Sequence, residues 1–194
     1  YEDEFGVYLQ TLSLFPIYDW LRVGLNFDLY ADRGTLIGPA VQYHKEGKNS
    51  SILGAISTGY IDDKGMTGVD IANKPIDKKR SFLLAQHKQT YNKKLFITLQ
   101  TNDLSDSEII RDFKESIYSQ NQFPINFFES TLILKNYGIN AFAHFKNEDF
   151  SKTRERLPEV SLHYFPNPIF RSSLFHFANI NYSKSEEDYI NTSI

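Results

Sequence analysis

The stretch that decides the fold is Leu-Arg-Val-Gly-Leu-Asn-Phe-Asp-Leu, residues 21–29. Its odd positions are all apolar, and its even positions are polar or glycine. Because successive side chains of a strand point to opposite faces, this pattern predicts a strand with one apolar and one polar face. A tilted strand of about 9–11 residues is also what crosses the hydrocarbon core of a bilayer.

Composition narrows the function classes. Aromatic residues make up 15% of the 194 residues, which fits both β structure and the aromatic girdles of membrane barrels. The net charge of −3 leaves no basic footprint, so we expect no nucleic-acid partner. With no cysteine, the sequence has no disulfide framework and no thiolate metal site. The mean hydropathy of −0.41 does not exclude a membrane protein, because barrel strands are half polar.

The alternation of residues 21–29 returns along the chain and predicts about ten strands. They span residues 6–15, 19–31, 35–46, 51–61, 80–91, 94–103, 124–135, 138–147, 159–165 and 172–184. In the second half, short turns at 91–94, 136–138 and 166–168 alternate with long connections at 62–79, 104–123 and 148–158. This alternation is typical of an up-and-down membrane barrel. Apolar residues at helical spacing within 105–118 predict one short loop helix, opened by a capping box of Ser105 and Glu108.

The sequence offers few residues for covalent chemistry. The acidic residues around Asp106 do not match a calcium loop, and no Gly-x-Ser-x-Gly elbow is present. We therefore expect no metal, no cofactor and no enzyme activity. A Ser–His site assembled from different strands, as in an outer-membrane lipase, stays open. The five histidines fall one to a predicted strand: His44, His87, His144, His163 and His176.

Polar side chains allow two interpretations. Arg22, Asn26 and Asp28 could line an aqueous lumen, but the same alternation fits the wet side of a soluble sheet. The charge clusters at 77–80 and 154–156 are predicted to lie in loops. There they either face solvent or bind the phosphates of anionic lipids.

Several stretches together resemble the family of outer-membrane lipopolysaccharide-assembly proteins, LptD. Each stretch is weak by itself, but their order and spacing over most of the chain are similar to the early part of that family's β-barrel. They are Leu14–Tyr18, Phe27–Gly34, Ile37–Ala40 with Gln42-Tyr43, Arg80 with Gln86–Gln89, Leu104–Glu108 with Asp112-Phe113, and Glu155–Glu159.

The resemblance implies a non-enzymatic translocon in the outer membrane of a Gram-negative-type cell. Such a barrel passes lipopolysaccharide outward and releases it through a lateral opening between its first and last strands. The implied partners are lipopolysaccharide, a plug lipoprotein of the LptE type and the periplasmic bridge proteins that deliver the lipid. Pro16 is similar to a proline that weakens strand pairing near the opening, although it could simply help the turn before Trp20.

The expected fold is therefore all-β: an antiparallel up-and-down transmembrane β-barrel, present as an incomplete arc of about ten strands. Because ten strands of such a barrel leave two raw edges, and no initiator methionine or signal peptide is present, we expect residues 1–194 to be a fragment of one barrel domain. The jellyroll and the remaining strands would lie outside it. Two alternatives remain: a general porin or other outer-membrane transporter, and a soluble β-sandwich that binds carbohydrate or protein.

Overall fold

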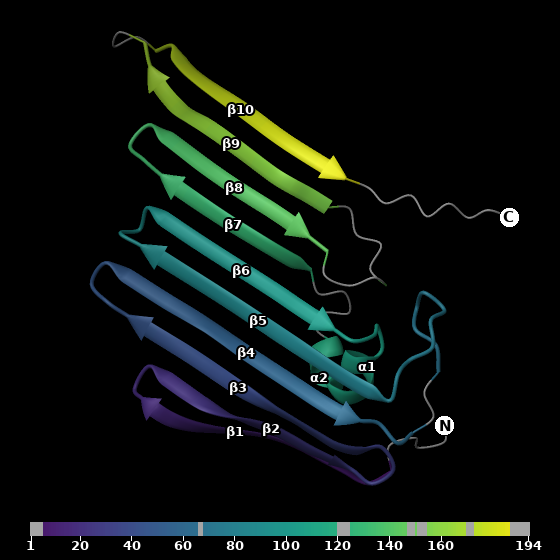
Figure 1. Ribbon diagram of the computed structural model, residues 1–194. Helices are drawn as coiled ribbons and strands as arrows, with labels where there is room; N and C mark the ends of the chain where they lie inside the picture. The colour runs from purple at the N-terminus through teal and green to yellow at the C-terminus, as the bar shows by residue number, and fades with distance from the viewer. Residues whose placement is uncertain are drawn as a thin grey trace, which may run out of the picture.

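The computed structural model describes residues 6–65, 68–119, 125–146, 150, 155–169 and 173–186. They form one ten-stranded sheet in which every strand is antiparallel to the next in the sequence (Figure 1). The strands are β1 (Tyr8–Tyr18), β2 (Leu21–Tyr30), β3 (Gly34–Glu46), β4 (Ser50–Asp62), β5 (Lys79–Tyr91), β6 (Leu95–Leu104), β7 (Asn126–Ile133), β8 (Tyr137–Phe145), β9 (Glu155–Pro168) and β10 (Phe175–Glu186). The all-β, up-and-down fold is thus confirmed, and β1 and β10 are the open edges of the sheet.

All ten predicted strands are present, but two proline-containing segments differ from the prediction. Residues 166–168 were expected to form a turn, whereas Asn167 and Pro168 pair with His176 and Phe175 of β10. Likewise β1 continues through Pro16, which lies opposite Arg22. Proline keeps an extended backbone and is tolerated where its missing N–H faces an edge or an irregularity, and β1 and β9 each contain such a register shift.

The predicted loop helix is two short helices, α1 (Ile109–Phe113) and α2 (Glu115–Tyr118), separated at Lys114. The predicted capping box is wrong, because α1 begins after Glu108 without a side-chain cap. The Ser105 hydroxyl instead donates to Asp106 Oδ2 at 2.8 Å and accepts from the Ser81 backbone N–H at 3.1 Å. No helix in the described ranges is long and apolar enough to cross a membrane.

The sheet has two chemically distinct faces. Side chains opposite one another in neighbouring strands share a face, so the register assigns each residue to one of them. The apolar face carries mainly aliphatic and aromatic side chains over all ten strands, among them Phe15, Leu25, Phe27, Ile37, Ile56, Leu83, Leu99, Phe128, Ile139, Leu162 and Ile180. The polar face carries mostly amides, hydroxyls and charges in its middle rows, among them Gln42, Gln86, Lys88, Thr98, Gln100, Glu129, Asn140, Ser161 and Asn181.

No other layer formed by the described residues covers the apolar face. Phe27, Ile56 and Leu162 on β2, β4 and β9 keep 38%, 39% and 36% of their surface exposed. A soluble sandwich would bury such a face against a second sheet. Within the described ranges there is one sheet, and its apolar rows face outward.

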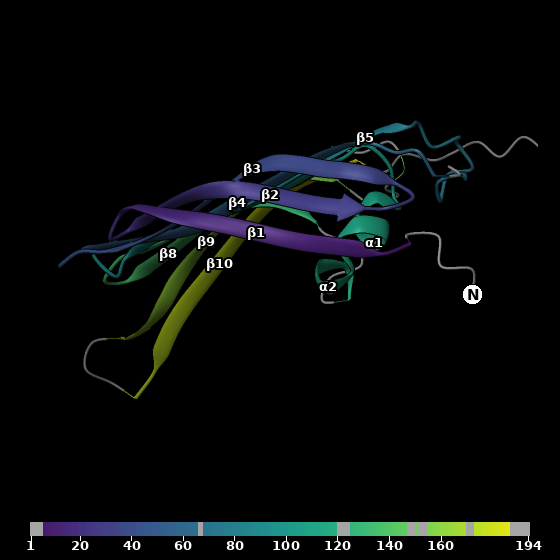
Figure 2. The ribbon, with the colours of Figure 1, turned by 90° about the horizontal axis from the view of Figure 1, so that it is seen from below.

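The sheet is twisted and curved (Figure 2), and glycines allow its first strands to curl. A Cβ at Gly24 of β2 would overlap the Ser13 carbonyl group of β1. A Cβ at Gly38 of β3 would overlap the Thr58 carbonyl group of β4. Glycine is required at both positions because another strand's backbone approaches the Cα directly.

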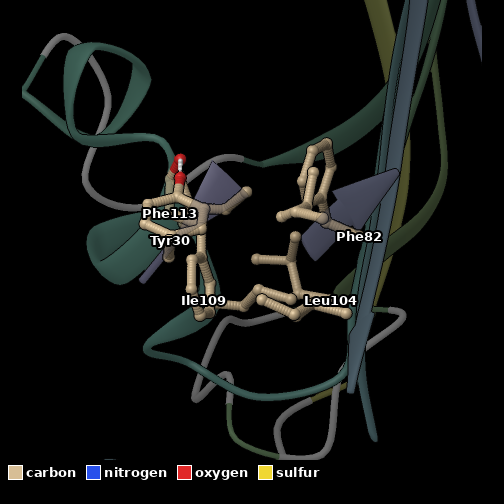
Figure 3. Close-up of a cluster of buried hydrophobic side chains, with 8 residues drawn as sticks. Tyr30, Phe82, Leu104, Ile109 and Phe113 are labelled. Carbon is tan, nitrogen blue, oxygen red and sulfur yellow. Dashed lines mark hydrogen bonds between the residues drawn. The ribbon is translucent and has the colours of Figure 1, made fainter. Parts of the chain in front are cut away.

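The hydrophobic core formed by the described residues lies at one end of the polar face. There the long β6–β7 connection folds back and lays α1 over the strand ends (Figures 1 and 2). Ile109 and Phe113 of α1 face Phe82 and Leu104 of the sheet, beside Tyr30 (Figure 3). Leu36, Ile61 and Ile110 complete this buried cluster.

Candidate functional site

The polar face is the candidate site, and its two ends differ. At the end with the long connections it is sealed by α1 and by a buried ion cluster, which we define as Arg33, Arg80, Asp63, Asp106 and Asp112. At the end with the short turns it is open and contains a pocket.

Arg80 is the centre of the ion cluster. Its guanidinium donates two hydrogen bonds to the Asp106 carboxylate, at 2.9 and 2.7 Å. Its Nη1 also donates to Asp63 at 3.1 Å and to Asp112 at 2.8 Å. Arg80 is 1% exposed, so the charge depends wholly on these partners.

Arg33 completes the cluster from the β2–β3 turn. It donates from Nε and Nη2 to the two oxygens of Asp63, both at 2.6 Å. The ring of Phe113 lies 5.0 Å from the Arg33 guanidinium carbon and 5.1 Å from that of Arg80. These are cation–π distances, so the helix residue is held by both cations as well as by packing.

The ionic contacts shift the pKa values of two loop residues, Asp63 and Arg33. Burial by itself would raise the pKa of Asp63, but hydrogen bonds from Arg33, the Gly65 N–H and Arg80 outweigh it and hold the pKa below its ordinary value. The hydrogen bond to Asp63 raises the pKa of Arg33, although burial opposes this. Asp63 and Arg33 therefore remain ionised at neutral pH.

The sequence did not predict this cluster. Arg80 was expected to be one of several loop cations facing solvent or lipid phosphates; instead it is buried in β5, which corrects that interpretation. Arg33, Arg80, Asp106 and Asp112 do lie in the stretches that carry the family resemblance. Up to 79 residues separate the bonded partners, so only the fold reveals that these stretches meet.

The three predicted lumen residues all lie on the polar face, in alternate positions of β2. Asn26 is buried and donates to Ser57 Oγ and to the Thr58 carbonyl, both at 2.9 Å. Asp28 is also buried and accepts hydrogen bonds from Lys114 Nζ at 2.6 Å and from the Thr11 N–H at 3.0 Å. Arg22 alone of the three is exposed.

Pro16 lies on the open edge of the sheet. The Ala31 N–H donates to the Val7 carbonyl, and the β1–β2 register runs unbroken from there to the pair of Pro16 and Arg22. In an antiparallel pair every second residue turns its backbone groups away from the partner. Pro16, an odd number of residues from Val7, therefore presents its donor-free nitrogen to the open edge of β1.

The pocket at the short-turn end has a volume of about 380 Å³. It exists because the small Ala55 lies between longer side chains in one cross-strand row, Arg22, Gln42, Ala55 and Gln86. Lys88, Asp19 and Trp20 also line it. Trp20 stacks on Tyr18 with ring centroids 5.8 Å apart, and Lys45 Nζ lies 5.2 Å from the Trp20 ring.

A hydrogen-bonded Ser–His–Asn chain lies on the polar side of β9 and β10. His163 Nε2 lies 3.1 Å from Ser161 Oγ, and its Nδ1 lies 2.8 Å from Asn179 Oδ1. Serine, histidine and an orienting acceptor in this order match the connections of a serine-hydrolase triad. The Ser–His site that the sequence leaves open would combine different strands, whereas Ser161 and His163 lie two positions apart on β9 and share its polar face.

Within the described residues, no group of three or more histidine, aspartate or glutamate side chains is arranged to hold a metal ion. Comparison with known proteins gives no match, either to a family model or to a curated protein.

Proposed function

We propose that this chain is an arc of the wall of an outer-membrane β-barrel that transports lipopolysaccharide to the outer leaflet. The supporting observation is the chemistry of the two faces: ten antiparallel strands expose apolar side chains on one side and place polar side chains on the other. An exposed apolar face of this size is unfavourable in water and favourable against lipid.

Strand lengths agree with this proposal. Strands β2 to β6 contain 10, 13, 13, 13 and 10 residues, enough for tilted strands that need about 9–11 to cross the hydrocarbon core. Tyrosines on the apolar face lie toward both strand ends, Tyr60 at one end and Tyr91 and Tyr137 at the other. Such positions suit the two interfaces of a bilayer, where amphipathic rings are favoured.

The mechanism we propose is physical rather than covalent. The polar face accommodates the sugars and phosphates of lipopolysaccharide, while the acyl chains leave sideways through an opened seam. Pro16 is our candidate for the seam: it removes one donor from the open edge of β1, so a strand closing the barrel there forms one hydrogen bond fewer. The open edges of β1 and β10 would be closed by other strands of the barrel, and a plug lipoprotein would occupy the polar interior.

The lipid-facing assignment is tested by cysteine accessibility, for which the cysteine-free chain is suited. Ile56→Cys and Ala55→Cys place thiols at adjacent positions of β4, on the apolar and polar faces respectively. In the complete gene product in lipid vesicles, a membrane-impermeant maleimide should label Ala55→Cys and leave Ile56→Cys unmodified. Equal labelling of both positions would refute the membrane assignment and favour a soluble binding module.

Lipopolysaccharide transport is tested by photo-crosslinking in cells. A photoreactive residue at Gln100 on the polar face should crosslink to lipopolysaccharide, and one at Lys93 in the exposed β5–β6 turn should crosslink less. Solute conductance by the complete barrel without any lipopolysaccharide crosslink would favour the porin alternative.

The Ser161–His163–Asn179 chain supports a second candidate function, hydrolysis of acyl esters. His163 would take the Ser161 proton as the hydroxyl oxygen attacks the ester carbonyl, and would return it to the departing alcohol. Water then cleaves the acyl-serine. A fluorophosphonate probe should label Ser161 in the wild type and not in His163→Ala; absence of labelling in the folded wild type would exclude this candidate.

A further inference from the structure

We propose that the pocket at the short-turn end of the polar face binds a phosphate-bearing saccharide. This inference deepens the proposed function, on which its identification with the lipopolysaccharide headgroup rests. The pocket volume of about 380 Å³ falls within the range of about 300–1,000 Å³ typical of ligand pockets.

Two cations in the pocket are available to an anion. Arg22 and Lys88 are both exposed, and neither forms an ion pair with any residue that the structure describes. They enter from β2 and β5, on opposite sides of Ala55. Guanidinium and ammonium groups are the usual protein partners of phosphate.

The pocket cations differ from the cations at the sealed end, which are neutralised by carboxylates. Arg33, Arg80 and Lys114 at the other end are all paired with carboxylates at 2.6 to 3.4 Å. At the pocket the ionised lining groups are Arg22, Lys88 and Asp19, so the charge is positive by one when His44 is neutral. The pocket therefore offers positive charge that the protein itself does not neutralise.

Uncharged groups supply the saccharide part of the recognition. Gln42 and Gln86 flank Ala55 in the same cross-strand row as Arg22, and both are exposed. Each primary amide offers two donors and one acceptor oxygen, which suits sugar hydroxyls. The exposed Asp19 carboxylate repels a second phosphate but accepts hydrogen bonds from hydroxyls. A saccharide with one phosphate thus fits the lining better than inorganic phosphate or a neutral sugar.

The test measures binding to the complete gene product in detergent micelles. The probes are deacylated lipopolysaccharide oligosaccharide, the same oligosaccharide after phosphatase treatment, glucose 1-phosphate and inorganic phosphate, each followed by calorimetry. Arg22→Gln with Lys88→Gln removes both pocket cations. Lys48→Gln with Lys93→Gln is the matched control, because it removes two exposed turn cations at the same end of the sheet.

We expect the phosphorylated oligosaccharide to bind the wild type and the control double variant equally. The pocket double variant should bind at least about tenfold more weakly, because each lost charged hydrogen bond is worth about one order of magnitude. The phosphatase-treated oligosaccharide should bind the wild type as weakly as the phosphorylated oligosaccharide binds the pocket double variant. Equal binding of the treated and untreated oligosaccharides, or an unchanged affinity in the pocket variant, would overturn the inference.

The other probes distinguish the source of the ligand and the two proposals. Binding of glucose 1-phosphate as tight as that of the oligosaccharide would assign the pocket to free sugar phosphates, and inorganic phosphate binding equally would refute the saccharide part. If thiol labelling refutes the membrane assignment while the pocket variant still loses binding, the pocket stands and the transport function falls. If thiol labelling supports the membrane assignment while the pocket variant keeps its affinity, the transport function stands and the pocket inference falls.

Discussion

At the scale of single residues, the neighbouring groups decide whether a charged side chain is buried or exposed. Arg22 and Arg80 both lie on the polar face, yet Arg22 is exposed whereas Arg80 is buried among three carboxylates. Asn26 and Asp28 show the same principle, since both are buried but hydrogen-bonded. A charged side chain on this face is therefore either neutralised within the fold, as Arg80 is, or left exposed, as Arg22 is.

The first prediction concerns Arg80. Arg80→Met removes the cation from Asp106 and leaves Asp63 and Asp112 with Arg33 alone, so it should destabilise the folded protein by about 3–5 kcal/mol. Lys79→Met changes the exposed neighbouring residue and should alter stability by no more than about 0.5 kcal/mol. Urea unfolding in detergent, followed by circular dichroism, compares the two variants. Equal midpoints would show that the ion cluster does not stabilise the fold.

The second prediction is a pH dependence from Asp63. Because the folded state lowers the pKa of this carboxyl below its ordinary value of 3.8, ionised Asp63 stabilises the protein above that pH. The contribution is lost as the pH falls through the folded-state pKa. The stability difference between wild type and Asp63→Asn should thus be largest at neutral pH and shrink in strong acid. A difference that stays constant over this range in unfolding experiments would contradict the ionic role.

At the scale of elements, backbone contacts shape the sheet as much as side chains do. β1 and β2 approach each other where Gly24 lacks a Cβ, and this allows the tight curl of the first strands. The β5–β6 hairpin closes through Asn92 and Lys93 at positive φ values of 50° and 54°, as expected for a type I′ turn. Turn residues within one short segment thus define each hairpin, whereas the curl depends on how closely two neighbouring strands approach.

The third prediction tests the curl. Gly24→Ala introduces a methyl group into the Ser13 carbonyl and should cost about 1–3 kcal/mol, because the β1 backbone must move away. Gly68→Ala is the control, since a Cβ there meets nothing within 4 Å. Chemical unfolding of both variants in the same detergent measures the cost. A neutral Gly24→Ala would mean that β1 moves freely from β2 at this point.

At the scale of the whole molecule, the sheet has two chemically different faces. Among the residues that the structure describes, its apolar face is uncovered on all ten strands, its polar face is sealed at one end, and its two outermost strands have unpaired edges. This arrangement suits a wall between lipid and water, and it underlies both the transport proposal and the pocket.

The fourth prediction follows from the lipid-facing assignment. Leu99→Arg places a cation on the apolar face near the middle of β6 and should destabilise insertion by about 2–4 kcal/mol. Thr98→Arg carries the same charge at the adjacent position of the polar face and should be nearly neutral. Folding of the complete gene product into lipid vesicles, titrated with urea, measures both. Equal tolerance of the two arginines would contradict a lipid-facing β6.

The sequence by itself determined the strands and their two faces. Alternation of period two, as in residues 21–29, is a local property of the chain, and turn residues mark where one strand ends and the next begins. Tertiary structure alone decided the ion cluster, the burial of Asn26 and Asp28, and the pocket beside Ala55. The ion cluster, the contacts of Asp28 and the pocket each join residues from three or more segments, and Asn26 joins β2 to β4. No local pattern records which distant side chains share a face at the same height of the sheet. That depends on the register and curvature of the assembled strands.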